Sequence, residues 1–300
     1  MTRRALDTSP VPVPALSDVL ALSKPITWFP PMWAFGCGVL SSGVPVADRW
    51  LFLIAGLLLT GPLVCGTSQA VNDWFDRHVD AINEPDRPIP SGRIAGRWGL
   101  AIAIIGSGLA LIVGLATGPW VFAATVLGLV FAWAYSAPPL RLKADGRIGP
   151  AVVGLCYEGL PWFTGAAVMA GALPDARVLV VLLLYSAGAF GIMTLNDFKA
   201  IAGDRVTGVR SLPAVLGPAR AGRIACVAMA VPQIIVVALL WHWQFAIAAT
   251  AVAVSLAVQL VLMRRLLTDP KRLAPWYNAT GTTLFVLGMA AAAAGLGSAA

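Results

Sequence analysis

Nine apolar runs, each about as long as a membrane-crossing helix, constrain this 300-residue chain more than any other feature. They lie near residues 26–43, 51–71, 98–116, 119–136, 148–171, 177–195, 221–241, 243–263 and 277–298. A helix needs about 20 apolar residues to cross roughly 30 Å of hydrocarbon, and within lipid only helices and closed barrels satisfy their own backbone. We therefore expect an all-α integral membrane protein with about nine transmembrane helices.

The composition excludes an ordinary soluble domain. Hydrophobic residues make up 58% of the chain and charged residues only 12%, about half the share typical of globular proteins. The net charge is +7, but the basic residues are spread over short segments between apolar runs, which favours membrane orientation over nucleic-acid binding. The four cysteines stand singly in apolar segments, so we expect packing roles and neither disulfides nor a zinc site.

The distribution of basic residues supports nine crossings. If residues 1–24 lie in the cytoplasm, 19 of the 21 lysines and arginines fall on the cytoplasmic side, and only Arg49 and Arg177 fall outside. This is the asymmetry that membrane proteins show between their two sides. We expect a cytoplasmic N-terminal tail, residues 1–24, and a single transmembrane domain, residues 25–300.

Residues 71–94, VNDWFDRHVDAINEPDRPIPSGRI, hold five acids and three arginines next to an apolar run. Charge of this density at a membrane span is costly and indicates a functional site. Asp73, Asp76 and Asp80 fall within roughly a 60° arc of a helix, and clustered carboxylates need cations to offset their repulsion. Together with Asn72 they offer the oxygen ligands that suit Mg²⁺ shared with substrate phosphates. The alternative is a solvated loop that only sets the orientation of the chain in the membrane. Orientation depends on basic residues, however, and does not require three acids on one face.

A second acidic segment, LNDFKAIAGDR, ends the run at 177–195. Its position four spans later predicts a parallel internal repeat, with two acidic sites, near 72–97 and 196–220, facing each other on the cytoplasmic side. Asn196, Asp197 and Asp204 are its oxygen-bearing residues. Asp197 and Asp204 share a helix face only if the helix continues through Gly203.

Residues 135–147, YSAPPLRLKADGR, separate the two acidic segments. Pro138 and Pro139 should end the preceding helix. Arg141 and Lys143 then lie in a short cytoplasmic loop, where they either fix topology or, with Tyr135, bind a departing anion. Glu158 is an acid at membrane depth, and such a residue should face a cavity within the bundle.

The string NDWFDRHVDAINEPDRPIPSG resembles the first aspartate-rich motif of the UbiA superfamily of intramembrane prenyltransferases, and in particular its chlorophyll and bacteriochlorophyll synthase branch. The segment 135–147 is similar to the superfamily's signature between the fourth and fifth spans. The second motif departs from the branch, because Ala202 stands where a glutamate is usual. The resemblance covers most of the nine spans.

The resemblance implies Mg²⁺-dependent esterification of the propionate of a chlorophyllide or bacteriochlorophyllide with geranylgeranyl or phytyl diphosphate, in the inner (cytoplasmic or photosynthetic) membrane of a bacterium. It assigns catalysis to Asp73, Asp76, Asp80, Asp197 and Asp204, with Asn72, Asp73, Asp76, Asn196, Asp197 and Asp204 as metal ligands. We expect diphosphate binding by Arg77, Arg87, Tyr135, Arg141, Lys143, Lys199 and Arg205. Glu158 and His78 are candidate pigment contacts.

Two other functions remain open from the sequence. A quinone or haem prenyltransferase of the same superfamily would use the same metal site with a different acceptor. A transporter or pigment-binding membrane protein without catalysis is the alternative from another class, since paired helix-end sites also occur in transporters. Turnover with a prenyl diphosphate separates the second from the first.

Overall fold

The computed structural model describes residues 12–298, except for the side chains of Val206 and Thr207, and within that range the chain is helical with no strands. The α-helices are α1 (Leu16–Leu22), α2 (Phe29–Ser41), α3 (Val46–Leu58), α4 (Gly66–Asn83), α5 (Trp98–Thr117), α6 (Pro119–Ser136), α7 (Ile148–Gly154), α8 (Leu160–Ala170), α9 (Ala176–Asn196), α10 (Ile201–Thr207), α11 (Leu212–Leu216), α12 (Pro218–His242), α13 (Ala246–Leu266) and α14 (Pro270–Gly297). The expected all-α class is confirmed.

Two of the spanning segments contain a π-helical turn. Residues Leu59–Cys65, with Pro62 inside, join α3 to α4, so that one helix runs from Val46 to Asn83. Residues Leu155–Gly159 join α7 to α8 in the same way. A wider turn of this kind is rare and often marks a functional position, and here each turn contributes side chains to the central cavity.

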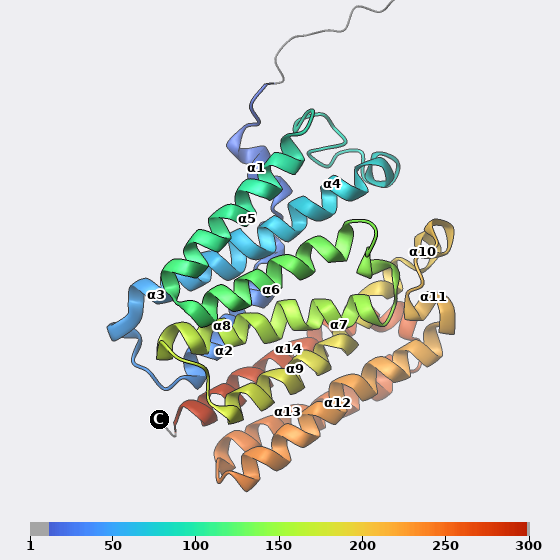
Figure 1. The fold of residues 1–300 in the computed structure, drawn as a ribbon. Helices are drawn as coiled ribbons and strands as arrows, with labels where there is room; N and C mark the ends of the chain where they lie inside the picture. Colours follow the sequence, from blue (N-terminus) through green and yellow to red (C-terminus); the bar gives the residue numbers. More distant parts are fainter. Residues whose placement is uncertain (1–11, 299–300) are drawn as a thin grey trace, which may run out of the picture.

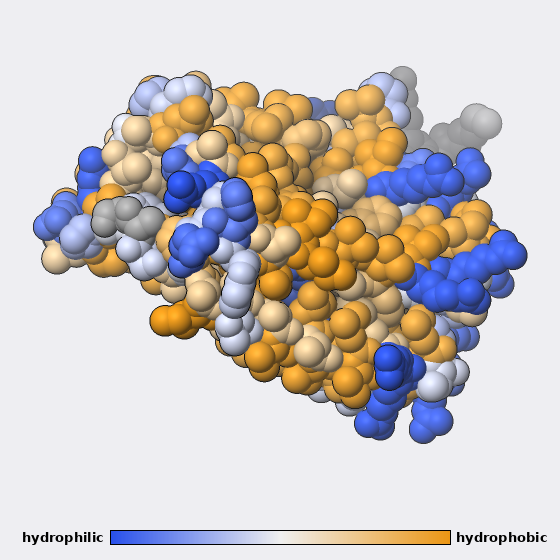
Figure 2. Space-filling view, turned by 90° about the horizontal axis from the view of Figure 1, so that it is seen from below, coloured by the Kyte–Doolittle hydropathy of each residue, from blue (hydrophilic) through white to orange (hydrophobic). Residues whose placement is uncertain are grey.

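The helices lie side by side, with α4, α5 and α6 along one side of the bundle and α12 and α13 along the other (Figure 1). Between them lie α2, α8, α9 and α14. Exposed large apolar side chains cover the outer helices, for example Ile112 on α5, Ile234 on α12 and Val261 on α13. Figure 2 shows one such face as an apolar band with hydrophilic residues toward its ends. A surface of this kind suits lipid, and the chain is an integral membrane protein.

Glycines allow α2 and α8 to pack closely at the centre of the bundle. A Cβ on Gly38 would lie 2.1 Å from the carbonyl oxygen of Trp162, and one on Gly165 would lie 2.1 Å from that of Phe35. Small residues commonly permit such close approach between membrane helices. This contact fixes α8, and with it the π-turn that carries Glu158, against the central helices.

Eight helical segments within residues 12–298 are long and apolar enough to cross a membrane. The ninth expected span, 26–43, contains α2, whose 13 residues extend only about 20 Å. Lys24, just before α2, contacts Asp73 at the acidic end of the bundle, whereas Leu40 at its other end packs against Gly297, at the end of α14. The segment thus connects both ends of the bundle, and the count of nine crossings stays a prediction.

The expected tail, residues 1–24, is not separate from the bundle where the structure describes it; residues 1–11 lie outside the described part. Leu22 on α1 is fully buried, and Asp18 forms an ion pair with Arg93 at 2.7 Å. The acidic segment 72–97 is helical in its first half, because α4 continues through its first three acids to Asn83. The carboxylates of Asp73 and Asp80 on this part of α4 are paired with basic side chains, described below.

Labelling of single cysteines in a background without the four native cysteines tests the topology. Asp86→Cys and Ala202→Cys, both at exposed positions, should react with a membrane-impermeant reagent from the cytoplasmic side, and Ser298→Cys only from the opposite side. The reason is that an odd number of crossings separates the acidic motifs from the end of α14. Equal labelling of positions 86 and 298 from one side would rule out nine crossings.

Candidate active site

The first acidic motif occupies the last three turns of α4. Asp73 and Asp80 are buried there, and Asp76 is half-buried. Their spacing places all three carboxylates toward the interior of the bundle end, as the helical arc predicts. Neighbouring carboxylates repel one another when both are ionised, so the surroundings must supply positive charge.

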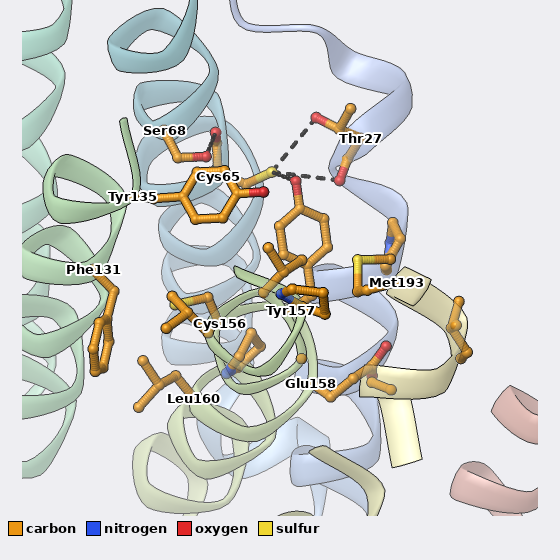
Figure 3. A pocket seen from close by; sticks show the side chains of 18 of the residues that line it. Thr27, Cys65, Ser68, Phe131, Tyr135, Cys156, Tyr157, Glu158, Leu160 and Met193 are labelled. Atoms are coloured by element: carbon orange, nitrogen blue, oxygen red, sulfur yellow. Dashed lines mark hydrogen bonds between the residues drawn. The ribbon is translucent and has the colours of Figure 1, made fainter. Parts of the chain in front are cut away.

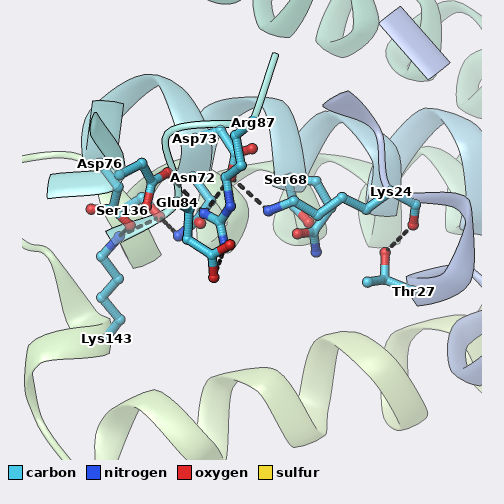
Figure 4. Close-up of polar contacts among 12 residues, drawn as sticks. Lys24, Thr27, Ser68, Asn72, Asp73, Asp76, Glu84, Arg87, Ser136 and Lys143 are labelled. Carbon is cyan, nitrogen blue, oxygen red and sulfur yellow. Dashed lines mark hydrogen bonds and ion pairs between the residues drawn. The ribbon is translucent and has the colours of Figure 1, made fainter. Parts of the chain in front are cut away.

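Basic side chains from three different segments supply this charge (Figure 4). Lys24 Nζ lies 2.6 Å from Asp73 Oδ1, and Arg87 Nη1 lies 2.8 Å from Asp80 Oδ2 and 3.4 Å from Asp73 Oδ1. Burial by itself would lower the pKa of Arg87, but the carboxylates of Asp73 and Asp80 outweigh it, and the net direction is upward. Arg87 therefore stays a cation between two acids.

Lys143 and Arg141 complete the set from the loop after α6. Lys143 Nζ donates to Asp76 Oδ2 and lies 3.4 Å from Ser136 Oγ, while Arg141 Nη2 lies 3.5 Å from Asp76 Oδ1. The helix α6 ends at Ser136, before the two prolines, as the sequence predicts. Burial lowers the pKa of Lys143, and its hydrogen bond and attraction to Asp76 offset this only in part.

The second acidic motif lies at the end of α9. The helix stops at Asn196, a 3-10 turn covers Asp197–Lys199, and α10 follows, so Asp197 and Asp204 do not share one continuous helix. The chain nevertheless folds both side chains onto the wall of one cavity. Ser211 Oγ donates to Asp204 Oδ2 at 2.5 Å, and Asn278 Nδ2 donates to Asn196 Oδ1 at 2.7 Å.

The loop at 137–147 is tied to the second motif through the backbone. Asp145 and Arg210 form an isolated parallel bridge, in which the N–H of Gly146 donates to the carbonyl of Arg210 at 3.1 Å. A Cβ on Gly146 would lie 2.3 Å from that carbonyl, so only glycine fits. This bridge holds Lys143, which contacts the first motif, beside the segment that follows the second.

A cavity of about 740 Å³ opens between the two motifs and continues into the bundle. Figure 3 shows part of its lining, with Tyr135, Tyr157 and Glu158 among the labelled side chains. Its polar end is lined by Asn72 from the first motif, by Asn196, Asp197 and Asp204 from the second, and by Tyr135 and Lys143. Deeper in the bundle, apolar side chains from α2, α6 and α9 predominate, whereas α14 contributes Asn278, Thr282 and Thr283 besides Val286. The cavity thus joins a charged end to an apolar interior, as a diphosphate with a hydrocarbon tail requires.

Several residues predicted from the sequence do not line this cavity. Arg77 packs over the ring of Trp74 at 4.3 Å and donates to the Trp74 carbonyl, and His78, Lys199 and Arg205 are exposed. Of the first motif only Asn72 lines the cavity, because Asp73, Asp76 and Asp80 are not among its lining residues. Arg87 and Arg141 contact these acids and do not line the cavity either. Glu158, predicted to face a cavity in the bundle, does line it. The binding roles of all these residues stay predictions.

The structure brings to the site several residues that the sequence did not indicate. Lys24 carries only a topological charge in the sequence pattern, although it precedes Pro25 at the entry to the first span. Gln69 lies one turn before Asn72 on α4 and donates to Tyr157 at 3.1 Å, and Cys65 contacts the same hydroxyl at 3.6 Å. The three-residue spacing from Gln69 to Asn72 could have indicated a shared face; no local signal could have indicated Tyr157 as its partner.

The oxygen-bearing residues suit a divalent metal shared with phosphates. Within residues 12–298, no three acidic, cysteine or histidine side chains form a ready metal cluster. Mg²⁺ needs less, since one or two carboxylates together with substrate phosphates and water commonly hold it. Asp73 Oδ2 is buried without a hydrogen-bond partner, and Asp197 and Asp204 face the cavity. The two motifs therefore fit Mg²⁺ that arrives with a diphosphate.

Comparison with known proteins matches residues 28–287 to the UbiA prenyltransferase family. The chain is 56% identical to the bacteriochlorophyll synthase 33 kDa chain of Cereibacter sphaeroides, over 96% of this chain and 95% of that one. It is 52% identical to the corresponding protein of Rhodobacter capsulatus, over 96% of each. Plant chlorophyll synthases are more distant, for example 37% identical in Arabidopsis thaliana, over 90% of this chain and 72% of that one.

Solved structures share the fold. A digeranylgeranylglyceryl phosphate synthase superimposes with a TM-score of 0.74 at 20% identity, covering 94% of this chain and 99% of the other. A UbiA homologue from Archaeoglobus fulgidus, solved with GPP and Mg²⁺, superimposes with a TM-score of 0.71 at 18% identity, covering 91% and 99%. At these identities the likeness concerns the fold.

Proposed function

This chain belongs to the UbiA prenyltransferase family, and from that premise we propose that it esterifies the propionate of a chlorophyllide or bacteriochlorophyllide with geranylgeranyl or phytyl diphosphate, releasing diphosphate. The chain is an enzyme of (bacterio)chlorophyll biosynthesis. The observation that carries the proposal is one cavity that joins two acids, Asp197 and Asp204, and the buried cation of Lys143 at one end to a largely apolar interior within the membrane.

The chain's own cations would bind the leaving group. In the reaction, a propionate oxygen forms a bond to the first carbon of the prenyl chain, while the bond from that carbon to the diphosphate oxygen breaks and its electrons leave with the diphosphate. Lys143 lines the cavity, and Lys24 and Arg87 contact Asp73 of the first motif. Fixed positive charge where negative charge develops is a large source of catalysis.

We propose that Mg²⁺ binds through Asn72, Asp73 and Asp76 and through Asn196, Asp197 and Asp204. Bound there, it would supply further positive charge to the diphosphate. The structure of the Archaeoglobus fulgidus homologue with GPP and Mg²⁺ supports this choice of metal. We further propose that both motifs face the cytoplasm of a bacterial inner membrane.

The most direct test is an acceptor assay. Purified protein with Mg²⁺ and geranylgeranyl diphosphate should convert bacteriochlorophyllide or chlorophyllide into its prenyl ester, detected by mass. The pigment with its propionate blocked as the methyl ester is the matched control and should not react. Prenylation of a quinone or haem precursor instead, with no pigment ester, would favour another branch of the family.

His78→Ala should retain most of the activity. A propionate has a pKa of about 4 to 4.5 in water, so it arrives ionised and needs no base to attack the prenyl carbon. His78 is exposed and does not line the cavity, which fits this absence of a role in proton transfer. Steady-state rates between about pH 6.5 and 8 should be nearly flat in both proteins. A loss of more than about tenfold in His78→Ala, with pigment binding intact, would contradict esterification without a general base.

A further inference from the structure

The deep part of the cavity has two walls with different hydrogen-bonding properties. We call the α6 wall the lining from Leu59, Thr60, Val64, Ala124, Thr125 and Gly128, and the α14 wall the lining from Glu158, Ala189, Ile192, Asn278, Thr282 and Val286. Figure 3 shows Glu158 beside Met193 of α9, away from Phe131 of α6. The two walls therefore belong to different sides of the bundle.

The hydroxyl groups of the α6 wall already have partners in their own helices. Thr60 Oγ1 donates to the carbonyl of Gly56 at 2.9 Å, and Thr125 Oγ1 donates to that of Val121 at 2.8 Å. A hydroxyl satisfied in this way has no proton left to donate to a ligand. The α6 wall therefore behaves as an apolar surface and suits a hydrocarbon chain, which offers no hydrogen bonds.

The α14 wall carries polar atoms without partners. Six buried side-chain atoms in residues 12–298 lack a hydrogen-bond partner, and three of them, Glu158 Oε2, Asn278 Oδ1 and Thr282 Oγ1, belong to residues that line this wall. Glu158 is only 5% exposed, and no ion pair involves it within the described residues. Buried polar groups are normally satisfied, so unpaired ones that share a cavity wall indicate a polar ligand.

These three residues descend from the second acidic motif into the membrane. Asn278 is hydrogen-bonded to Asn196 of the second motif. Thr282 lies about one turn, roughly 6 Å, further along α14 toward the interior of the bundle. Gly159, next to Glu158, packs against Ser186, which lies ten residues and about 15 Å along α9 from Asn196. The polar atoms thus extend along one wall from the point where diphosphate would leave to the middle of the bundle.

We propose that Thr282 and Glu158 form a hydrogen-bonding subsite for the acceptor, a rigid tetrapyrrole with carbonyl groups on its rim, and that Asn278 joins this subsite to the second motif. The inference rests on the proposed function and deepens it. Thr282 can donate its O–H. A carboxyl group at this depth without a cation beside it is least costly as the neutral acid, which also has an O–H to donate. The α6 wall is then left for the prenyl chain.

Equilibrium binding of bacteriochlorophyllide to purified protein, without Mg²⁺ or diphosphate so that no turnover occurs, tests the subsite. Thr282→Val and Glu158→Leu should each weaken binding about tenfold, the effect of losing one buried hydrogen bond. Glu158→Gln retains a donor and should stay within about threefold of the parent protein. The KM for prenyl diphosphate should change less than about twofold in all three, since both side chains bind the pigment and not the prenyl chain.

The matched control is Thr125→Val on the α6 wall, whose hydroxyl is already satisfied, and its pigment affinity should stay within about twofold of the parent. Parent-like binding by both Thr282→Val and Glu158→Leu would overturn the subsite, as would equal losses in Glu158→Gln and Glu158→Leu. If the parent protein neither binds nor esterifies the pigment, the proposed function fails. If it does both and the variants do not differ from it, only the subsite fails.

Resonance Raman spectra of the bound pigment give a second measurement, whose decisive part needs only the parent protein. A carbonyl that accepts a hydrogen bond vibrates at lower frequency than a free one. At least one pigment carbonyl should be lowered in the parent protein and return to the free frequency in Thr282→Val or Glu158→Leu. Only free carbonyl frequencies in the parent protein would overturn the proposal, even if Glu158→Leu failed to fold.

Discussion

Asp73→Asn is expected to lower turnover roughly 100- to 1,000-fold, the range found when one group that stabilises developing charge is removed. Asp73 is fully buried, its Oδ1 contacts both Lys24 and Arg87, and its Oδ2 has no hydrogen-bond partner. Asparagine keeps the size and removes the charge, so the helix should persist. The variant lacks only the carboxylate that we propose binds Mg²⁺.

Binding measurements separate this role from a purely structural one. Without Mg²⁺, removal of the Asp73 charge frees Lys24 for the substrate, whereas Arg87 stays paired with Asp80, so Asp73→Asn should bind prenyl diphosphate at least as tightly as the parent protein. Addition of Mg²⁺ should increase the affinity of the parent protein for prenyl diphosphate, and it should increase that of Asp73→Asn only slightly. Isothermal titration with and without Mg²⁺ measures both effects.

Asp86→Asn is the matched control, because Asp86 lies exposed in the segment after α4 and should tolerate the change. It should retain the Mg²⁺-dependent gain in affinity and nearly all activity. A full Mg²⁺-dependent gain in Asp73→Asn would show that Asp73 is not a ligand. Weaker diphosphate binding by the variant without metal would contradict the competition between Asp73 and the substrate for Lys24.

Features with a local cause were predictable from the sequence. The helical spacing of Asp73, Asp76 and Asp80 placed them on one face of α4, and Pro138 and Pro139 ended α6 at Ser136. Glu158 was expected to face a cavity because an isolated acid in a membrane span is too costly to place against lipid. In each case a few residues close together in the sequence determine the local structure.

Features that depend on distant residues were not predictable in the same way. Lys24 and Asp73 are 49 positions apart, and Asn196 and Asn278 are 82 apart, so only the packing of the bundle brings them together. The parallel bridge between Asp145 and Arg210 has no pattern in either segment that predicts it. The same limit applies to Asp197 and Asp204, which reach one cavity through a break in the helix that spacing alone does not describe.

Two basic residues in the loop after α6 have similar positions in the sequence but different exposure in the structure. Lys143 and Arg141 are both basic, and both contact Asp76. The side chain of Lys143 is 13% exposed and lines the cavity, while that of Arg141 is 45% exposed and does not. A buried cation keeps most of its electrostatic effect, whereas an exposed one is screened by water and salt.

The alkaline side of the activity profile should reflect the burial of Lys143. Its pKa lies below the ordinary value of 10.5, with burial as the main cause, so its charge is lost as the pH rises through that lowered pKa. Activity should therefore fall at a lower pH than deprotonation of an exposed lysine would require. Lys143→Arg, which keeps its charge at any accessible pH, should move this fall to higher pH, as measured by kcat/KM against pH.

Lys143→Met is expected to lower kcat/KM about 100-fold, whereas Arg141→Met should lower it less than about fivefold. Methionine replaces the stem of either side chain without its charge, so the pair differs in the position of the missing cation. Loss of Lys143 removes positive charge where the diphosphate would leave and also leaves Asp76 with only the more distant, exposed Arg141. Most of the loss should therefore fall on kcat, because the charge on the leaving group is greatest in the transition state. Equal losses in the two variants would mean that the loop acts through its total charge, and a loss confined to KM would mean that Lys143 only holds the substrate.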